Sequence, residues 1–262
     1  KNIKLFKPNM ILMVPLMIET FAKKLEDVKD LPEKVVKEAV FGSQFHTICS
    51  GGAYLNPEYI ELFERFGIQI LQGYGMTECS PVISTTVAWN VKKNSVGQLL
   101  PNCEAKTVDG ELWVRGSSVM QGYYKMPEET KTALKDGWLC TGDLGYVDED
   151  RFIYLTGRKK NLIITKNGEN VSPEELENKL SSSRLVQEVL VREAKGVIEA
   201  EIYPDEEYAK KQGLEREEEV RVELQKLIDE YNQGAPAYKK IYSLIIREKE
   251  FEKTASRKIK RY

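Results

Sequence analysis

The sequence has few of the residues that common catalytic and metal sites need. It contains one histidine, His46, and four cysteines that show no metal-ligand spacing. A site with several histidine ligands is therefore excluded. A Ser-His-Asp triad would have to use His46, yet no GxSxG elbow is present. We expect His46 to be a strand residue with a satisfied ring, and the dispersed cysteines to be reduced thiols in the cytoplasm.

Excess charge and long apolar runs are also missing. The formal net charge of the 262 residues is −2, so no broad basic field favours nucleic acid as a partner. The longest apolar run, residues 10–18, contains Pro15 and is too short to span a bilayer. No secretory signal is visible. These features predict a cytoplasmic protein without a transmembrane segment, and they leave peripheral membrane contact open.

Two familiar nucleotide-binding loops are absent. There is no GxxxxGK[ST] loop, and the pair Gly73 and Gly75 lacks the third glycine of a dinucleotide fingerprint. The pair instead belongs to the heptapeptide QGYGMTE, residues 72–78, which follows an apolar run at 68–71. Its glycines permit close backbone approach, and Glu78 can hold a hard cation such as magnesium. Taken alone, the heptapeptide is equally well explained as a glycine turn with a solvated Thr-Glu pair.

Residues 1–84 alternate between predicted strands and helices. Strands are expected at 10–14, 45–49 and 68–71, with helices at 16–28, 32–41 and 56–66. Asn56 and Pro57 form a strong helix start. This alternation predicts a parallel sheet, with the glycine loops after Cys49 and Leu71 side by side at one edge.

The rest of the chain is predicted to form two further regions of different secondary structure. Residues 85–157 read as a small, barrel-like β subdomain with a hairpin turn at Asp109-Gly110. Residues 158–262 read as a separate α+β domain, with helices at 173–180 and 216–231 and strands at 186–191, 197–203 and 240–247. Ser172 and Glu175 have the spacing of a capping box.

Five short motifs occur in a characteristic order: SGGA at 50–53, GYGMTE at 73–78, TGD at 141–143, GR at 157–158 and a lysine near the end. Their order and spacing resemble the adenylate-forming superfamily of acyl- and aryl-CoA ligases, luciferases and peptide-synthetase adenylation domains. The resemblance covers residues 50–261. Segments 136–145 and 158–173 make the chain most similar to long-chain fatty acid–CoA ligases.

The resemblance implies a fold and a reaction. Residues 1–157 would be an α/β remnant of the large adenylate-forming domain with its small β-barrel-like subdomain, and residues 158–262 a mobile α+β C-terminal domain. The enzyme would use ATP and magnesium to convert a fatty acid into an acyl-adenylate, and coenzyme A would then displace AMP. Two alternatives stay open: an adenylating enzyme that loads a carrier protein, and a non-catalytic nucleotide-binding module.

The resemblance also implies roles for individual residues. Lys258, Thr77 and Glu78 would be catalytic, Glu78 as the magnesium ligand. Lys160 would be the hinge, and Gly168 would lie at the coenzyme A channel. The ATP/AMP-binding set would be Gly52, Ala53, Gly73, Tyr74, Gly75, Met76, Thr77, Asp143, Leu155 and Arg158. Within it, Tyr74 would lie against adenine, Thr77 would bond the α-phosphate and Asp143 would accept from the ribose hydroxyls.

The chain departs from the family pattern in two places. Arg257 stands where the family has a glycine before the catalytic lysine, and residues 1–49 contain no Ser/Thr/Gly-rich phosphate loop. We therefore expect the chain to be the C-terminal portion of a longer enzyme that makes no acyl-CoA by itself. We also expect apolar strand faces at 10–14 and 45–49 to be exposed and to allow self-association.

Overall fold

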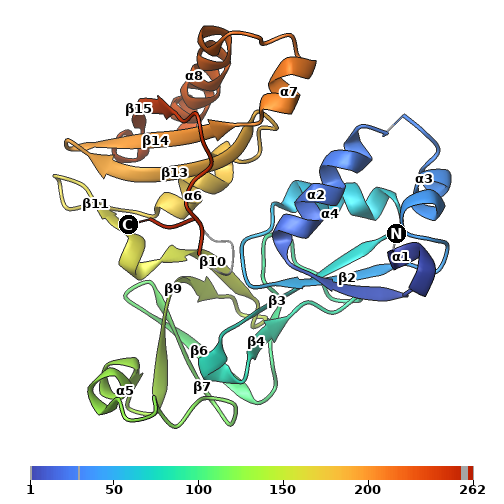
Figure 1. Cartoon of the computed structure of the whole chain (residues 1–262). Helices are drawn as coiled ribbons and strands as arrows, with labels where there is room; N and C mark the ends of the chain where they lie inside the picture. The colour runs from blue at the N-terminus through green and yellow to red at the C-terminus, as the bar shows by residue number, and fades with distance from the viewer. Residues whose placement is uncertain (1, 29, 255–258, 262) are drawn as a thin grey trace. The chain divides into compact units, whose positions relative to one another are not determined.

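The computed structural model of the chain describes residues 2–28, 30–254 and 259–261. The chain divides into two compact units, residues 1–155 and residues 156–262, and Figure 1 shows their elements in chain order. In the described part, no helix combines the length and the apolar character needed to cross a membrane. All four cysteines are free thiols.

The first unit holds an α/β layer and a second, antiparallel sheet. Its helices are α1 (Asn2–Phe6), α2 (Pro15–Glu26), α3 (Glu33–Val40), α4 (Pro57–Arg65), the 3-10 turn η1 (Thr77–Cys79) and α5 (Pro127–Ala133). Its strands are β1 (Met10–Met13), β2 (Thr47–Gly51), β3 (Gln69–Gly75), β4 (Val82–Thr85), β5 (Gln98–Leu99), β6 (Cys103–Val108), β7 (Glu111–Gly116), β8 (Leu134–Lys135), β9 (Trp138–Val147) and the start of β10 (Ile153–Arg158).

The predicted parallel sheet is confirmed. Strands β1, β2 and β3 pair in parallel, and β4 and β5 extend the sheet with antiparallel pairs. Helices α2 and α4 pack on the same side of these strands (Figure 1), around fully buried Phe41, Phe45 and Phe63. The side-chain oxygen of Asn56 accepts the amide proton of Glu58 at 2.9 Å, which confirms the predicted cap of α4.

The second sheet has the hydrogen-bonded order β10–β9–β7–β6, with β8 on β9. The hairpin predicted at Asp109-Gly110 is confirmed, because β6 and β7 pair from Val108↔Glu111 outward. Both turn residues have positive φ, +50° and +79°, as a type I′ turn requires. No β6–β10 pair closes the sheet among the described residues.

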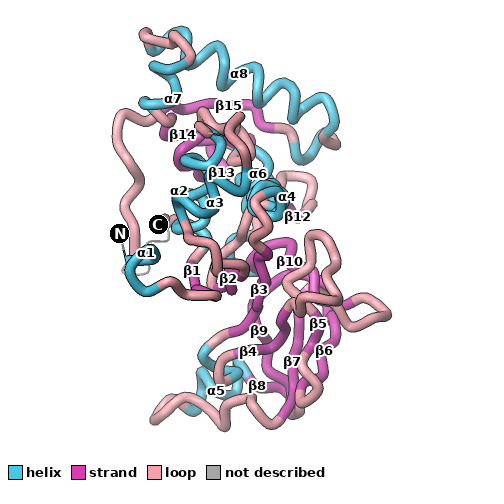
Figure 2. The backbone as a smooth tube through the Cα atoms, turned by 90° about the vertical axis from the view of Figure 1, so that its right-hand side faces the viewer, coloured by secondary structure: helices cyan, strands magenta, loops and turns pink. Residues whose placement is uncertain are grey.

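The second unit is a three-stranded sheet covered by helices. Its elements are η2 (Lys159–Asn161), β11 (Ile163–Ile164), β12 (Asn170–Val171), α6 (Pro173–Leu180), β13 (Val186–Ala194), β14 (Val197–Pro204), α7 (Glu206–Lys211), α8 (Glu217–Gly234), η3 (Ala237–Lys239) and β15 (Ile241–Ile246). Strand β14 pairs antiparallel with β13 and parallel with β15. Helices α6 and α8 pack against this sheet (Figure 2) and share its apolar core.

The predicted capping box of α6 is wrong. Ser172 does lie at the N-cap, but its hydroxyl makes no capping bond and instead donates to Glu174 Oε2 at 3.0 Å. The Glu175 carboxylate pairs with Lys239 at 2.6 Å. The neighbouring carboxylate of Glu174 and the distant Lys239 have replaced the expected capping bonds.

The predicted exposure of apolar side chains is confirmed for the first strand and wrong for the second. Met10, Leu12 and Val14 are 53%, 82% and 53% exposed, and β1 is an edge strand. Phe45 and Ile48, by contrast, are completely buried in the core under the helices. His46 is exposed and precedes β2, so it is not a strand residue; its ring Nδ1 does share a 2.7 Å hydrogen bond with the Thr47 hydroxyl.

Candidate functional site

The two glycine loops lie side by side at the carboxyl ends of β2 and β3, as predicted. The parallel register pairs Gly51 with Gly73. A Cβ atom at Gly51 would lie 2.9 Å from the Gly73 carbonyl oxygen, and one at Gly75 would lie 1.9 Å from the Pro81 carbonyl oxygen. Glycine is therefore needed at both positions for the backbones to approach.

The residues just beyond these strand ends are open to solvent. Gly52 and Ala53 are exposed directly after β2, and Gly75 and Thr77 are exposed at the end of β3. Met76 between them is half-buried. Gly52 has φ +89°, and no atom lies within 4 Å of a Cβ built there. The edge that carries the predicted nucleotide contacts is thus an accessible backbone surface.

Tyr74 and Asp143 join the two central motifs. The Tyr74 hydroxyl donates a hydrogen bond to Asp143 Oδ2 at 2.7 Å, across 69 residues of sequence. Tyr74 is 7% exposed and Asp143 is 5% exposed. The fold therefore brings the predicted adenine and ribose residues together, in a setting where little of either side chain reaches solvent.

A local network fixes the TGD segment in β9. The Thr141 hydroxyl donates to the Leu112 carbonyl at 2.7 Å and accepts the Asp143 amide proton at 3.1 Å. The Gly142 amide donates to Glu111 Oε1 at 2.9 Å. Gly142 has φ +71°, a value that favours glycine. Each residue of the motif thus contributes to the position of the Asp143 carboxylate.

Glu78 lies in η1, half-buried, at the end of the same loop. Its Oε1 accepts a 2.9 Å hydrogen bond from the Tyr123 hydroxyl, and its carbonyl oxygen accepts the Met120 amide proton at 2.8 Å. Sequence reasoning missed Tyr123. The only signal was an aromatic pair, Tyr123 and Tyr124, directly after Gly122.

The remaining predicted residues are spread along the two units. In the first unit, Leu155 is 37% exposed on β10. In the second unit, Arg158 is half-buried, Lys160 is exposed in η2 and Gly168 is exposed with φ +80° in the turn between β11 and β12. The Gly168 amide donates to the Thr165 carbonyl at 2.9 Å, which closes that turn.

Lys258 lies outside the described residues, so its predicted role stays a prediction. The described residues on either side of it are firmly held. Lys253 and Ile259 form an antiparallel bridge, and the Lys260 amide donates to the Glu252 carbonyl at 2.8 Å. Arg261 binds both carboxylate oxygens of Glu177 in α6, at 2.9 and 2.5 Å.

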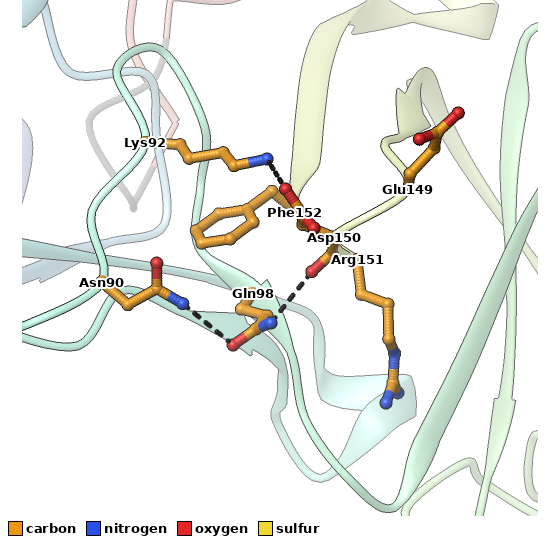
Figure 3. Close-up of a pocket in the computed structure, with 7 residues that line it drawn as sticks. All are labelled: Asn90, Lys92, Gln98, Glu149, Asp150, Arg151 and Phe152. Atoms are coloured by element: carbon orange, nitrogen blue, oxygen red, sulfur yellow. Dashed lines mark hydrogen bonds and ion pairs between the residues drawn. The ribbon is translucent and has the colours of Figure 1, made fainter.

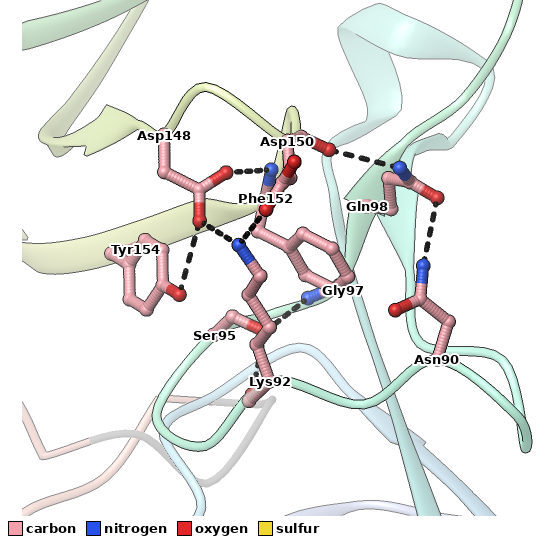
Figure 4. Close-up of polar contacts among 9 residues, drawn as sticks. All are labelled: Asn90, Lys92, Ser95, Gly97, Gln98, Asp148, Asp150, Phe152 and Tyr154. Carbon is pink, nitrogen blue, oxygen red and sulfur yellow. Dashed lines mark hydrogen bonds and ion pairs between the residues drawn. The ribbon is translucent and has the colours of Figure 1, made fainter.

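A cavity of about 450 Å³ in the first unit is not lined by any predicted site residue. Its lining residues, drawn in Figure 3, are Asn90, Lys92, Gln98, Glu149, Asp150, Arg151 and Phe152. Lys92 ion-pairs with Asp148 at 2.7 Å and with Asp150 at 2.6 Å (Figure 4). The bond from Lys92 lowers the pKa of Asp148 below its usual range. Because the Lys92 ammonium is already bound by two carboxylates, we assign the cavity no ligand.

The residues present fit a magnesium ion shared with a nucleotide. Among the described residues, no group of three or more His, Cys, Asp or Glu side chains could hold a metal ion on its own. Magnesium bound to nucleotides typically takes one or two carboxylates and completes its shell with phosphate oxygens and water. A single carboxylate at Glu78, next to an open glycine loop, matches that pattern.

Comparison with known proteins identifies the family of the chain. The family model described as AMP-binding enzyme matches residues 1–124, and the one described as AMP-binding enzyme C-terminal domain matches residues 160–262. A long-chain-fatty-acid–CoA ligase of Mycobacterium bovis is 40% identical over 171 residues, which are 64% of this chain and 28% of the relative. A long-chain-fatty-acid–CoA ligase of Bacillus subtilis is 38% identical over 163 residues, 57% of this chain and 29% of the relative.

Solved structures of o-succinylbenzoate CoA synthetase from Bacillus subtilis share the fold. Its complex with an acyl-adenylate intermediate has a TM-score of 0.77 and 28% identity, covering 98% of this chain and 51% of that one. Its complex with ATP and magnesium has a TM-score of 0.72 and 27% identity, covering 96% and 50%. The chain thus spans about half of that structure and less than a third of the two curated relatives. The chain belongs to the AMP-binding enzyme family of adenylate-forming ligases.

Proposed function

We propose that this chain is part of a long-chain acyl-CoA ligase, which activates a fatty acid with ATP and transfers the acyl group to coenzyme A. The observation that carries the proposal is the 2.7 Å bond between Tyr74 and Asp143, which unites the GYGMTE and TGD motifs in one place. Long-chain fatty acid as the substrate is supported by the two curated relatives. The free thiols suit a cytoplasmic setting.

In the first half-reaction, a carboxylate oxygen of the fatty acid attacks the α-phosphorus of ATP and the bond to pyrophosphate breaks. Tyr74 and the open backbone at Gly52 and Ala53 would flank the adenine, and Asp143 would accept from the ribose hydroxyls. Thr77 is exposed and can donate to an α-phosphate oxygen. Glu78 would hold magnesium, which would offset the charge of the phosphates.

The second unit would contribute to both half-reactions. Lys258 would stabilise negative charge on the carboxylate and α-phosphate during adenylation. In the second half-reaction the sulfur of coenzyme A attacks the acyl carbonyl carbon and AMP leaves. A swing about Lys160, with the Gly168 turn brought to the thiol channel, would assemble that state. Exposure of Lys160 and Gly168 is compatible with both roles.

The proposal is tested by two assays on the full-length protein. Fatty-acid-dependent ATP–pyrophosphate exchange measures adenylation, and coenzyme A compared with a carrier protein as acceptor identifies the thiol. Glu78→Gln keeps the side-chain shape but removes its charge, so it should raise the adenylation barrier by about 2–4 kcal/mol. Glu149→Gln, at an exposed carboxylate away from the motifs, is the matched control and should exchange normally.

Two results would contradict the proposal. Normal exchange in Glu78→Gln would remove the magnesium role of that carboxylate. Acyl transfer to a carrier protein but not to coenzyme A would identify the enzyme as a carrier-protein-loading ligase instead.

A further inference from the structure

The Glu78 carboxylate is held by a loop from elsewhere in the first unit. The Tyr123 hydroxyl reaches Glu78 Oε1 at 2.9 Å, while the Met120 amide bonds the Glu78 carbonyl oxygen at 2.8 Å. One loop therefore holds both the backbone and the side chain of the same residue.

That loop is itself anchored to α5. The Tyr123 amide donates to the Thr130 hydroxyl at 2.9 Å, and this hydroxyl donates to the Met126 carbonyl at 2.7 Å. Gly122 fits against Thr130 so closely that a Cβ at Gly122 would lie 2.7 Å from the Thr130 methyl carbon. The phenol of Tyr123 is therefore presented to Glu78 from a backbone with little freedom to move.

The Tyr123 hydroxyl donates a hydrogen bond to one oxygen of the Glu78 carboxylate. Across the described residues no lysine or arginine forms an ion pair with Glu78. The Tyr123 hydroxyl thus orients one carboxylate oxygen, and no described cationic side chain competes with a metal ion for Glu78.

We infer that Tyr123 is a positioning residue of the magnesium site: its hydroxyl fixes Glu78 Oε1 so that the carboxylate faces the nucleotide-bound ion. The inference rests on the proposed function, because it assigns Tyr123 a role through Glu78. It makes Tyr123 part of the active site, although its side chain does not need to touch the substrate.

The test is a magnesium titration of ATP–pyrophosphate exchange in the full-length protein. Tyr123→Phe removes only the hydroxyl, and it should raise the magnesium concentration for half-maximal exchange about tenfold or more. The rate at saturating magnesium should fall much less. Tyr124→Phe is the matched control: the neighbouring ring is 85% exposed, so its magnesium dependence should be that of the wild type. Thr130→Val, which releases the Tyr123 amide but keeps the phenol, should shift the requirement in the same direction.

A double variant separates this inference from the proposed function. If Tyr123 acts through Glu78, then Tyr123→Phe should have no further effect in a Glu78→Gln background. Effects that multiply would show that Tyr123 acts independently, and an unchanged magnesium requirement in both Tyr123→Phe and Thr130→Val would equally overturn the inference. In either case a defective Glu78→Gln would leave the proposed function standing. Normal exchange in Glu78→Gln would overturn both.

Discussion

Removing Arg261 should destabilise the second unit selectively. Its guanidinium binds both oxygens of Glu177, which is 9% exposed and also accepts the Val191 amide proton at 2.7 Å. Removing one partner of a buried ion pair typically costs about 3–5 kcal/mol, because the other charge is left buried and unpaired. The two side chains retain 19% and 12% exposure, so we expect the lower end, about 3 kcal/mol, for Arg261→Met.

The pH dependence of this loss has a definite sign. Burial raises the pKa of Glu177 above its ordinary value of 4.5, and Arg261 opposes that rise. A raised folded-state pKa gives stability that is present below the unfolded value and lost as the pH rises through the folded value. Arg261→Met raises the folded pKa further. Its destabilisation should therefore be largest at neutral pH and should shrink as the pH falls toward 4.5.

Urea denaturation followed by two probes can isolate the effect. All three tryptophans, at positions 89, 113 and 138, lie in the first unit. Tryptophan fluorescence should therefore show an unchanged transition in Arg261→Met, while far-UV circular dichroism shows the second unit unfolding at lower urea. The control Arg216→Met breaks an exposed pair with Glu219 and should cost less than about 1 kcal/mol.

A second substitution tests the cause of the loss. Glu177→Gln removes the buried charge but keeps an acceptor for the Val191 amide, so adding it to Arg261→Met should recover about 1–2 kcal/mol. A double variant as unstable as Arg261→Met, or a destabilisation by Arg261→Met that grows at acid pH, would refute an unpaired buried carboxylate as the cause.

Three further outcomes are expected. In the full-length protein, Lys258→Ala should abolish adenylation but spare thioester formation from supplied acyl-adenylate, whereas Lys160→Pro should do the reverse by fixing φ at the hinge; equal losses in both half-reactions would contradict this division. Residues 1–262 alone should form no acyl-CoA from ATP, coenzyme A and fatty acids of several chain lengths; turnover like that of the full-length protein would overturn this expectation. In sedimentation runs these residues should self-associate through the edge strand β1. The substitution Leu12→Lys, at an 82% exposed position, should weaken that association. The bond from Lys92 lowers the pKa of Asp148, so the stability that this bond supplies should be fully present at a pH above 3.8, the ordinary pKa of the carboxyl, and lost at a pH below it. The melting temperatures of Lys92→Met and wild type should therefore differ at neutral pH and converge in acid. A constant difference would rule out the ion pair as the cause.

Local chemistry in the sequence was enough to predict several elements. The strand–helix alternation of residues 1–84 predicted the parallel strands β1 to β3, which then placed Gly51 beside Gly73. Asn56 and the Asp109-Gly110 turn each specify their own backbone conformation through bonds to near neighbours, so both predictions are confirmed. Such features depend on residues a few positions apart, and spacing alone reveals them.

Only the tertiary structure decided which side chains meet. Tyr74 bonds Asp143 across 69 residues, and Tyr123 bonds Glu78 across 45; no local spacing encodes either pair. The same cause explains part of the errors. Ser172 and Glu175 had the spacing of a capping box, but Ser172 bonds its neighbour Glu174, and Glu175 pairs with Lys239, 64 residues away in sequence. Phe45 and Ile48 are expected to be exposed if a missing half of the enzyme covers them, yet they are buried because α2 and α4 of this chain pack over them. A hydrogen bond or an apolar contact forms with whichever group the fold brings within reach, and that is a property of the whole chain.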